Sequence, residues 1–162
     1  MPDADEPGRG WGLRFSLAGA RRVAPVPEDP LPGRVNYLLG NDPAAWRTDL
    51  PTYGRLVWKD VYPGISLVVE SRPEGLAYRF ELAPGADARA IRMRWEGATD
   101  VRAVEHGRAL AFTTGLADAA LRETGLRCWQ PGAVGATPVP CGYTVTPAPG
   151  GAPGGAFAVA LA

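Results

Sequence analysis

Short apolar alternations that end at turn residues most constrain what this chain can fold into. The segments LAYRFEL (76–82) and AIRMRWE (90–96) place large apolar side chains at every second position. Because successive side chains of a strand point to opposite faces, this period of two predicts strands that each bury one face. Glycine, proline or a polar pair follows most such segments. We therefore predict an all-β, β-sandwich-like fold of many short antiparallel strands.

The rest of the chain follows the same pattern of short strands. The first predicted strand covers residues 11–18, where Trp11, Leu13 and Phe15 alternate with smaller or polar residues. Residues 21–33 contain four prolines, which lack an amide donor and predict an irregular connector. The other predicted strands are residues 35–39, 53–60, 65–70, 101–104, 109–113, 119–123, 126–130, 142–146 and 156–161.

Two local motifs predict specific backbone features. Asp42 followed by Pro43 supplies a capping oxygen and a first-turn proline, so one short helical turn is predicted over residues 42–46. Tyr62-Pro63-Gly64 predicts a type II turn. Since a type II turn matches the twist of a two-residue hairpin poorly, we expect a wider loop before residue 65.

Length and charge limit the classes of protein. The 162 residues suit one domain, so we predict a disordered tail at 1–10 and a single β domain over 11–162. Seventeen basic and 17 acidic residues are interspersed and cancel, which predicts no nucleic-acid partner. There is no apolar run of roughly 20 residues, so no membrane insertion is expected. The acidic N-terminus has no apolar signal core, so no export signal is predicted in this chain.

Motifs for catalysis and cofactors are missing from the sequence. There is no GxSxG, HExxH, P-loop or GxGxxG pattern, so we predict no catalytic residues, no cofactor and no metal. The single histidine, His106, is expected to be a solvated turn residue rather than a general base. Loop oxygens of Asn41, Asp42 and Asp49 could hold calcium, but they lack the spacing of a calcium-binding loop.

Aromatic residues offer the main candidate for a binding surface. Trp46, Tyr53, Trp58 and Tyr62 could form a platform for sugars, although aromatics at strand positions are more often core. For Trp46, both roles stay open. The capped loop that ends at this tryptophan is the candidate contact site, and its residues are Asn41, Asp42, Trp46 and Arg47.

The two cysteines, Cys128 and Cys141, leave two alternatives open. If they pair, the chain-entropy model makes the closed loop worth about 3 kcal/mol of stability. The other alternative is two small buried thiols. No CxxC spacing is present, so zinc binding and thioredoxin-like chemistry are not predicted.

Two long phrases carry a family resemblance. VNYLLGNDPAAWRTDLPTYGRLVWKDVYPGISLVV followed by LAYRFELAPGADARAIRMRWEGA resembles the domain that precedes the repeats in bacterial SBBP proteins, the β-propeller repeat family. The similarity runs from about Pro32 to Gly97. It implies a predominantly β module of secreted or cell-surface proteins without an assigned catalytic activity. The matching positions are Asn36, Tyr37, Gly40, Asn41, Asp42, Trp46, Arg47, Tyr53, Tyr62, Pro63, Gly64, Tyr78, Pro84 and Gly85.

These observations together predict a function. We expect a non-catalytic module that mediates protein contacts or surface adhesion, with a partner protein or its own longer chain as the partner. One alternative is a carbohydrate-binding module around Trp46, and a second is a glycosidase-type enzyme using two of Asp42, Asp49, Asp60 and Glu70. Since SBBP proteins carry further strands before this region, we also expect an unpaired sheet edge that a partner chain or a second copy covers.

Overall fold

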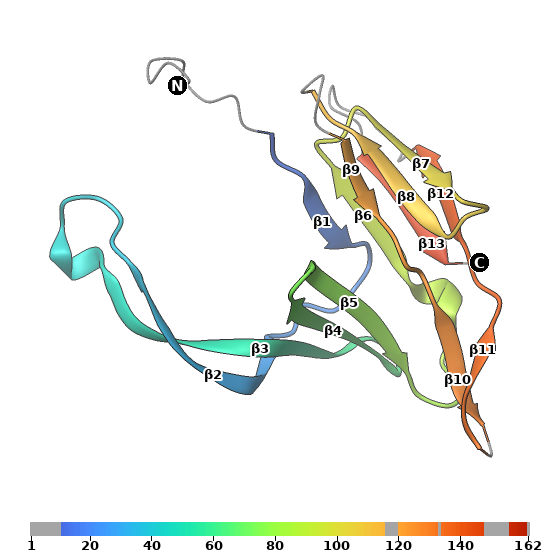
Figure 1. The fold of residues 1–162 in the computed structure, drawn as a ribbon, viewed down its shortest axis with the longest axis horizontal. Coiled ribbons are helices and arrows are strands. Elements are labelled where there is room, and N and C mark those ends of the chain that lie inside the picture. The colour runs from blue at the N-terminus through green and yellow to red at the C-terminus, as the bar shows by residue number, and fades with distance from the viewer. Residues whose placement is uncertain (1–10, 116–119, 133, 148–155, 162) are drawn as a thin grey trace. The chain divides into compact units, whose positions relative to one another are not determined.

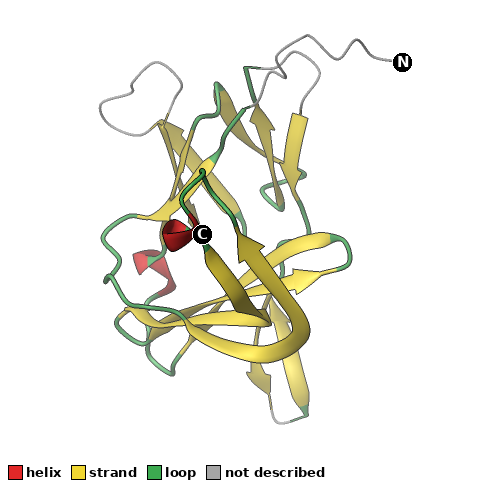
Figure 2. Ribbon diagram, turned by 90° about the vertical axis from the view of Figure 1, so that its left-hand side faces the viewer, coloured by secondary structure: helices red, strands yellow, loops and turns green. Residues whose placement is uncertain are grey.

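The computed structural model describes residues 11–115, 120–132, 134–147 and 156–161. Within these residues the regular structure is β-strand apart from two 3-10 turns, which confirms the all-β prediction (Figure 2). The chain divides into two compact units, one made of Met1–Gly19 with Ala88–Ala162 and one of Ala20–Asp87. The single domain over 11–162 stays a prediction, and the tail at 1–10 lies outside the described residues.

The unit Ala20–Asp87 is one four-stranded antiparallel sheet in the order β2-β3-β4-β5 (Figure 1). Successive hairpins connect its strands, so neighbours in sequence are neighbours in the sheet. Its buried residues come from β3 and β4 and are Val57, Val61, Tyr62, Ile65, Leu67 and Val68. The strands are β2 (Val26–Tyr37), β3 (Arg47–Tyr62), β4 (Ile65–Arg72) and β5 (Gly75–Leu82).

Strand β2 corrects the prediction of an irregular connector over residues 21–33. From Val26 onward the chain is a strand that pairs with β3, despite Pro27, Pro30 and Pro32. The sheet order makes β2 an edge strand. Because an edge strand has one side without a neighbour, proline's missing amide is tolerated there. The predicted strand 35–39 is the end of β2, which stops at Tyr37.

The turn between β3 and β4 is tighter than the sequence predicts. Tyr62 pairs directly with Ile65, so the expected wider loop is wrong and Pro63-Gly64 is a two-residue connection. Gly64 has φ of 70°, as the third position of a type II turn requires. The β3–β4 register shifts between Trp58 and Tyr62, and Asp60 in this interval has φ of 51°. A bulge increases the local twist of a strand pair. We therefore attribute the compatibility of a type II turn with this two-residue connection to the irregularity.

The described residues of the other unit form three sheets. One has the order β1-β6-β13-β12, a second has β7-β8-β9, and β10 pairs with β11 alone. The Trp95 ring lies 5.0 Å from the Phe15 ring and 4.7 Å from the Phe112 ring, measured between centroids. Since Phe15 and Trp95 belong to the first sheet and Phe112 to the second, the two sheets pack face to face, as in a sandwich. The strands are β1 (Arg14–Leu17), β6 (Arg92–Glu96), β7 (Asp100–Val104), β8 (Ala109–Thr113), β9 (Ala120–Glu123), β10 (Cys128–Gly132), β11 (Gly135–Val139), β12 (Tyr143–Pro147) and β13 (Ala156–Leu161).

Most predicted strands of this unit are confirmed, with small changes at their ends. Strand β11 was not predicted, because its sequence GATPV has neither apolar alternation nor strong β propensity. The 3-10 turn η2 (Ala88–Ala90) was also not predicted. His106 lies in the turn between β7 and β8 with φ of 56° and is exposed, as expected for a solvated turn residue.

Candidate interaction surface

The distal part of the β2–β3 hairpin is the most unusual feature of the unit Ala20–Asp87. Strand β4 pairs with β3 only over residues 55–62, whereas β2 and β3 stay paired from Pro30 and Tyr53 out to Tyr37 and Arg47. Figure 1 shows this ribbon continuing beyond β4 and β5. We call residues 30–53 the arm. A two-stranded hairpin is marginally stable by itself in water, so the arm lacks the support that the four-stranded part has.

The predicted contact residues all lie at the tip of the arm. Asp42 caps the 3-10 turn η1 (Pro43–Ala45), and its Oδ1 accepts the backbone N–H of Ala44 at 2.9 Å, which confirms the predicted helical turn. The indole Nε1 of Trp46 donates to the backbone oxygen of Gly40 at 3.1 Å. These two bonds close a compact loop that presents Asn41 and Arg47 to solvent.

Large apolar side chains on the arm are exposed to an unusual degree. Leu39 is 74% exposed and Tyr37 57% exposed, and every residue from 31 to 49 is exposed to solvent. Such a concentration of exposed large apolar side chains on one hairpin makes the arm a candidate surface for contact with other molecules. This surface was not predicted from the sequence, because residues 35–39 were predicted to form an ordinary strand. The exposed apolar residues of the arm are Leu31, Val35, Tyr37, Leu38, Leu39 and Trp46.

Charged residues of the arm are only loosely paired. The Asp49 backbone N–H donates to Asn36 Oδ1 at 2.8 Å, and the Asp49 carbonyl accepts from Arg34 at 3.2 Å. The Asp49 carboxylate lies 3.9 Å from Arg34 and is 79% exposed. With φ of 55°, Asp49 forms an irregularity in β3 opposite Asn36. The guanidinium of Arg47 has no hydrogen-bond or ion-pair partner among the residues that the structure describes.

The four aromatic residues considered as a sugar platform do not share one surface. Trp46 precedes the first residue of the 16-residue strand β3 and Tyr62 is its last residue, so roughly 50 Å of extended chain separates them. Tyr62 is buried, at 6% exposure, while Tyr53 and Trp58 are half-buried. Of these four residues, only Trp46 is exposed.

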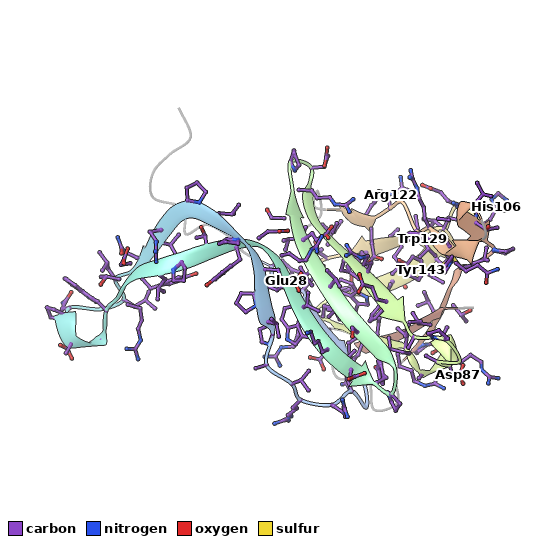
Figure 3. All side chains as sticks on the ribbon, turned by 90° about the horizontal axis from the view of Figure 1, so that it is seen from below. Glu28, Asp87, His106, Arg122, Trp129 and Tyr143 are labelled. Atoms are coloured by element: carbon purple, nitrogen blue, oxygen red, sulfur yellow. A yellow bond between two sulfur atoms is a disulfide. The ribbon has the colours of Figure 1, made fainter. Side chains whose placement is uncertain are left out.

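An ion-pair network crosses the sheet where the arm begins. Glu70 of β4 accepts hydrogen bonds from Arg55 of β3 at 3.1 Å, from Arg72 at 3.0 Å and from Arg79 of β5. Arg55 also binds Glu28 of β2 at 3.2 Å, so the network joins all four strands. Glu28 marks this position in Figure 3. The strand register explains the arrangement, because Arg55 stands directly opposite Glu70.

The network has a clear electrostatic consequence for Glu70. The hydrogen bonds from Arg79 and Arg72 lower the pKa of Glu70 from 4.5 to about 2. A glycosidase needs a carboxylic acid whose pKa is raised, and Glu70 has the opposite shift. A shallow groove of about 250 Å³ lies beside the network, with Lys59, Asp60 and Ser66 among its lining residues. Sequence reasoning missed the network because its members, apart from Arg72 beside Glu70 on β4, come together only across strands.

Metal binding at the arm tip gains no support from the geometry. Among the described residues, no group of three or more histidine, cysteine, aspartate or glutamate side chains is close enough to hold a metal ion. Asp42 uses its carboxylate as a helix cap, and Asp49 lies on β3 beside Arg34. Asn41, Asp42 and Asp49, which were considered as calcium ligands, therefore do not belong to a cluster of carboxylates.

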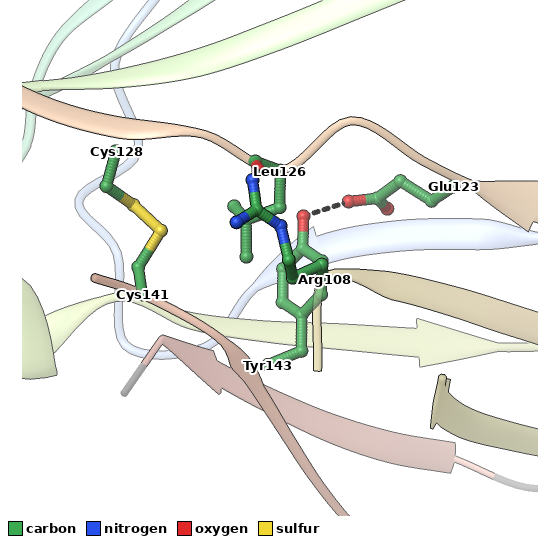
Figure 4. The surroundings of a disulfide bond; sticks show 6 residues. All are labelled: Arg108, Glu123, Leu126, Cys128, Cys141 and Tyr143. Carbon is green, nitrogen blue, oxygen red and sulfur yellow. Dashed lines mark hydrogen bonds between the residues drawn. A yellow bond between two sulfur atoms is a disulfide. The ribbon is translucent and has the colours of Figure 1, made fainter. Parts of the chain in front are cut away.

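A disulfide joins Cys128 to Cys141 in the other unit, with the two Cα atoms 6.1 Å apart (Figure 4). It closes the β10–β11 hairpin, because Cys128 begins β10 and Cys141 follows the end of β11. Tyr143 donates its hydroxyl to Glu123 beside this bond, as the dashed line in Figure 4 shows. A groove of about 440 Å³ runs along the hairpin and includes Trp129, which is 56% exposed.

Comparison with known proteins gives a family but no activity. The model of a family described as Domain of unknown function (DUF7948) matches residues 2–155. No curated protein and no solved structure matches this chain. In the described part of the chain, no helix is both long and apolar enough to span a membrane.

Proposed function

We propose that this chain, which belongs to the DUF7948 family, is a non-catalytic module that contacts other proteins through its arm. The observation that carries the proposal is the run of exposed large apolar side chains on a two-stranded ribbon. An uncovered apolar ribbon of this kind is marginally stable, and contact with a partner would remove its apolar surface from water. The arm therefore gains stability from binding, whereas a catalytic site would need rigid support.

We extend the proposal to surface adhesion and to an extracellular or cell-surface location. The resemblance of residues 32–97 to the domain before the SBBP repeats supports this extension. The disulfide between Cys128 and Cys141 also supports it, because such bonds persist in oxidising compartments. The partner would then be another surface protein or a further part of the same longer chain.

Carbohydrate binding at Trp46 is the second candidate. Trp46 is 36% exposed, and its N–H is already bonded to Gly40, so the indole ring is held in one orientation at the tip. A fixed, exposed aromatic ring is the feature that sugar-binding surfaces use for stacking. A glycan would contact this one ring, whereas a protein partner would cover the apolar residues along the whole arm.

Site-specific photo-crosslinking tests the proposed function. A benzophenone amino acid replaces Leu39 on the arm, and in a matched control it replaces Leu76 on β5, which is 82% exposed. We expect irradiation of the producing cells to yield protein adducts from position 39 and none from position 76. Mass spectrometry identifies the crosslinked chain, including a second copy of this one.

Two outcomes would contradict the proposal. Adducts at neither position would show that the arm contacts no protein. Adducts that carry only glycan, together with loss of glycan-array binding in Trp46→Ala, would replace the protein partner with a carbohydrate.

A further inference from the structure

We infer that the arm pairs with a second copy of this chain, through antiparallel pairing of Trp46 and the first four residues of β3 (residues 46–50) with the same residues of the copy. The inference rests on the proposed function and names the partner of the same surface. A two-fold axis relates identical strands that pair antiparallel, so one short segment contacts itself. The argument rests on the free edge of the arm, on the side chains at that edge, and on their charges.

The arm has one edge that favours strand addition. The β2 strand of the arm carries Pro30 and Pro32, which have no amide to donate to an added strand. On the opposite side, residues 47–50 of β3 contain no proline, and the described residues include no strand paired with them except β2. Unpaired backbone groups of an edge strand are a template for another chain. A second strand can therefore add beside β3 and continue the sheet where β4 stops.

The irregularity at Asp49 limits the length of this pairing. Its backbone N–H and C=O are both bonded to β2 side chains, those of Asn36 and Arg34. Because the residue is satisfied on the β2 side and bends β3, a long continuous ladder is not expected. A short pairing centred on Thr48 keeps the irregularity near its end.

The sequence of this segment, Trp46-Arg47-Thr48-Asp49-Leu50, is complementary to itself when it is paired antiparallel about Thr48. Trp46 then faces the partner's Leu50, and Arg47 faces the partner's Asp49. Thr48 faces the partner's Thr48 on the two-fold axis. Apolar pairs, opposite charges and threonine pairs are the cross-strand combinations that stabilise antiparallel sheets.

The charges in the arm agree with this partner. Arg47 has no partner among the described residues, and the carboxylate of Asp49 is 79% exposed. The pairing supplies each group with an opposite charge, twice in one dimer. Arg34 and Arg47 balance Asp42 and Asp49, so two arms carry no net charge that would keep them apart.

A charge-reversal cycle tests the pairing on the whole chain. Sedimentation velocity of the purified protein should show a monomer–dimer equilibrium. Arg47→Asp and Asp49→Arg should each weaken the dimer about tenfold, because each places like charges opposite one another at two symmetric positions. The double variant restores opposite charges and should recover most of the affinity. Arg22→Asp is the control, since it makes the same charge change outside the arm.

Cysteine crosslinking tests the register independently. Thr48→Cys brings two cysteines face to face on the axis, within the Cα separation that a disulfide allows. Mild oxidation should therefore produce a covalent dimer from this variant. Arg47→Cys faces the partner's Asp49 instead and should crosslink much less, as should the exposed control Ser71→Cys on β4. The native disulfide leaves no free cysteine among the described residues to interfere.

The outcomes separate this inference from the proposed function. A protein that stays monomeric at every concentration overturns the second copy, while crosslinks from position 39 to a different protein would still support a protein-contact module. A dimer that all three charge variants leave unchanged overturns the pairing over residues 46–50. Dimer loss in both single variants with recovery in the double variant, together with crosslinking of Thr48→Cys, establishes the pairing.

Discussion

The arm and the β10–β11 hairpin are two ribbons of similar construction that are stabilised in different ways. Among the described residues each consists of two antiparallel strands, and each carries an exposed tryptophan, Trp46 or Trp129. The β10–β11 hairpin is closed by the disulfide between Cys128 and Cys141. The arm has no covalent link and is joined to a four-stranded sheet at one end only.

This difference shows two solutions to the weakness of an isolated hairpin. A covalent bond restricts the unfolded chain, so the β10–β11 hairpin is stabilised without any further contact. The arm has only the sheet at its base and its own side-chain bonds at the tip. It leaves apolar surface in water, and this is why we assign the contact function to the arm and not to the hairpin.

The largest effect is expected in the four-stranded part of the sheet, at the end of β3 that lies away from the arm. Ile65 is fully buried in β4, opposite Tyr62 of β3. Ile65→Ala should lower the free energy of unfolding by about 2–5 kcal/mol, because it leaves a cavity among the buried residues of β3 and β4. Leu39→Ala on the arm should change it by less than about 0.5 kcal/mol. Urea denaturation measures both, and equal losses would show that the arm is packed like the four-stranded part of the sheet.

Removing the disulfide between Cys128 and Cys141 should have the next largest effect on stability. Replacing Cys128 and Cys141 together by serine should lower stability by about 3 kcal/mol on the chain-entropy model. Hydrogen exchange should then show faster exchange in β10 and β11, with unchanged rates at residues 30–53. If the arm also lost protection, the two ribbons would not be independent.

A smaller effect is expected from the network at the base of the arm. The folded-state pKa of Glu70 is about 2, below its value of 4.5 in an unfolded chain. The stabilisation from this carboxylate is therefore complete above about pH 4.5 and is lost as the pH falls toward 2. Glu70→Gln should lower stability at pH 7 by about 1–3 kcal/mol, because it removes a charged hydrogen-bond partner.

The matched control for this experiment is Glu74→Gln, in the exposed turn between β4 and β5. It should leave both the stability at pH 7 and its acid dependence unchanged. Acid titration of the unfolding free energy distinguishes the two variants. If Glu70→Gln kept the full pH dependence of the original protein, another carboxylate would have to be its source.

Local sequence patterns predicted many elements of the fold. The alternation in residues 76–82 and 109–113 gave strands β5 and β8, and Asp42 with Pro43 gave the turn η1. These patterns failed where pairing with a neighbouring strand determines whether a segment forms a strand. Proline in β2 is tolerated because of its edge position, and the weak sequence of β11 is a strand because β10 pairs with it.

For the candidate surface, the sequence indicated the tip but not the arm. Asn41, Asp42, Trp46 and Arg47 were selected from a capping motif and an aromatic residue, which are local signals. The exposure of Leu38 and Leu39 depends on where β4 ends along β3, and no local pattern reports this. The same holds for Glu70, because two of its three arginine partners, Arg55 and Arg79, lie on the neighbouring strands β3 and β5.

The sequence by itself determined the all-β class, the positions of most strands and the capped turn, because period-two alternation, caps and turn residues act over a few neighbouring residues. The cysteines left a bonded and an unbonded state open, and the structure has the bond. Only the tertiary structure decided the strand order, the ion-pair network and the uncovered arm. Each of these depends on which strands are paired and for how far, and that is a property of contacts between residues distant in sequence.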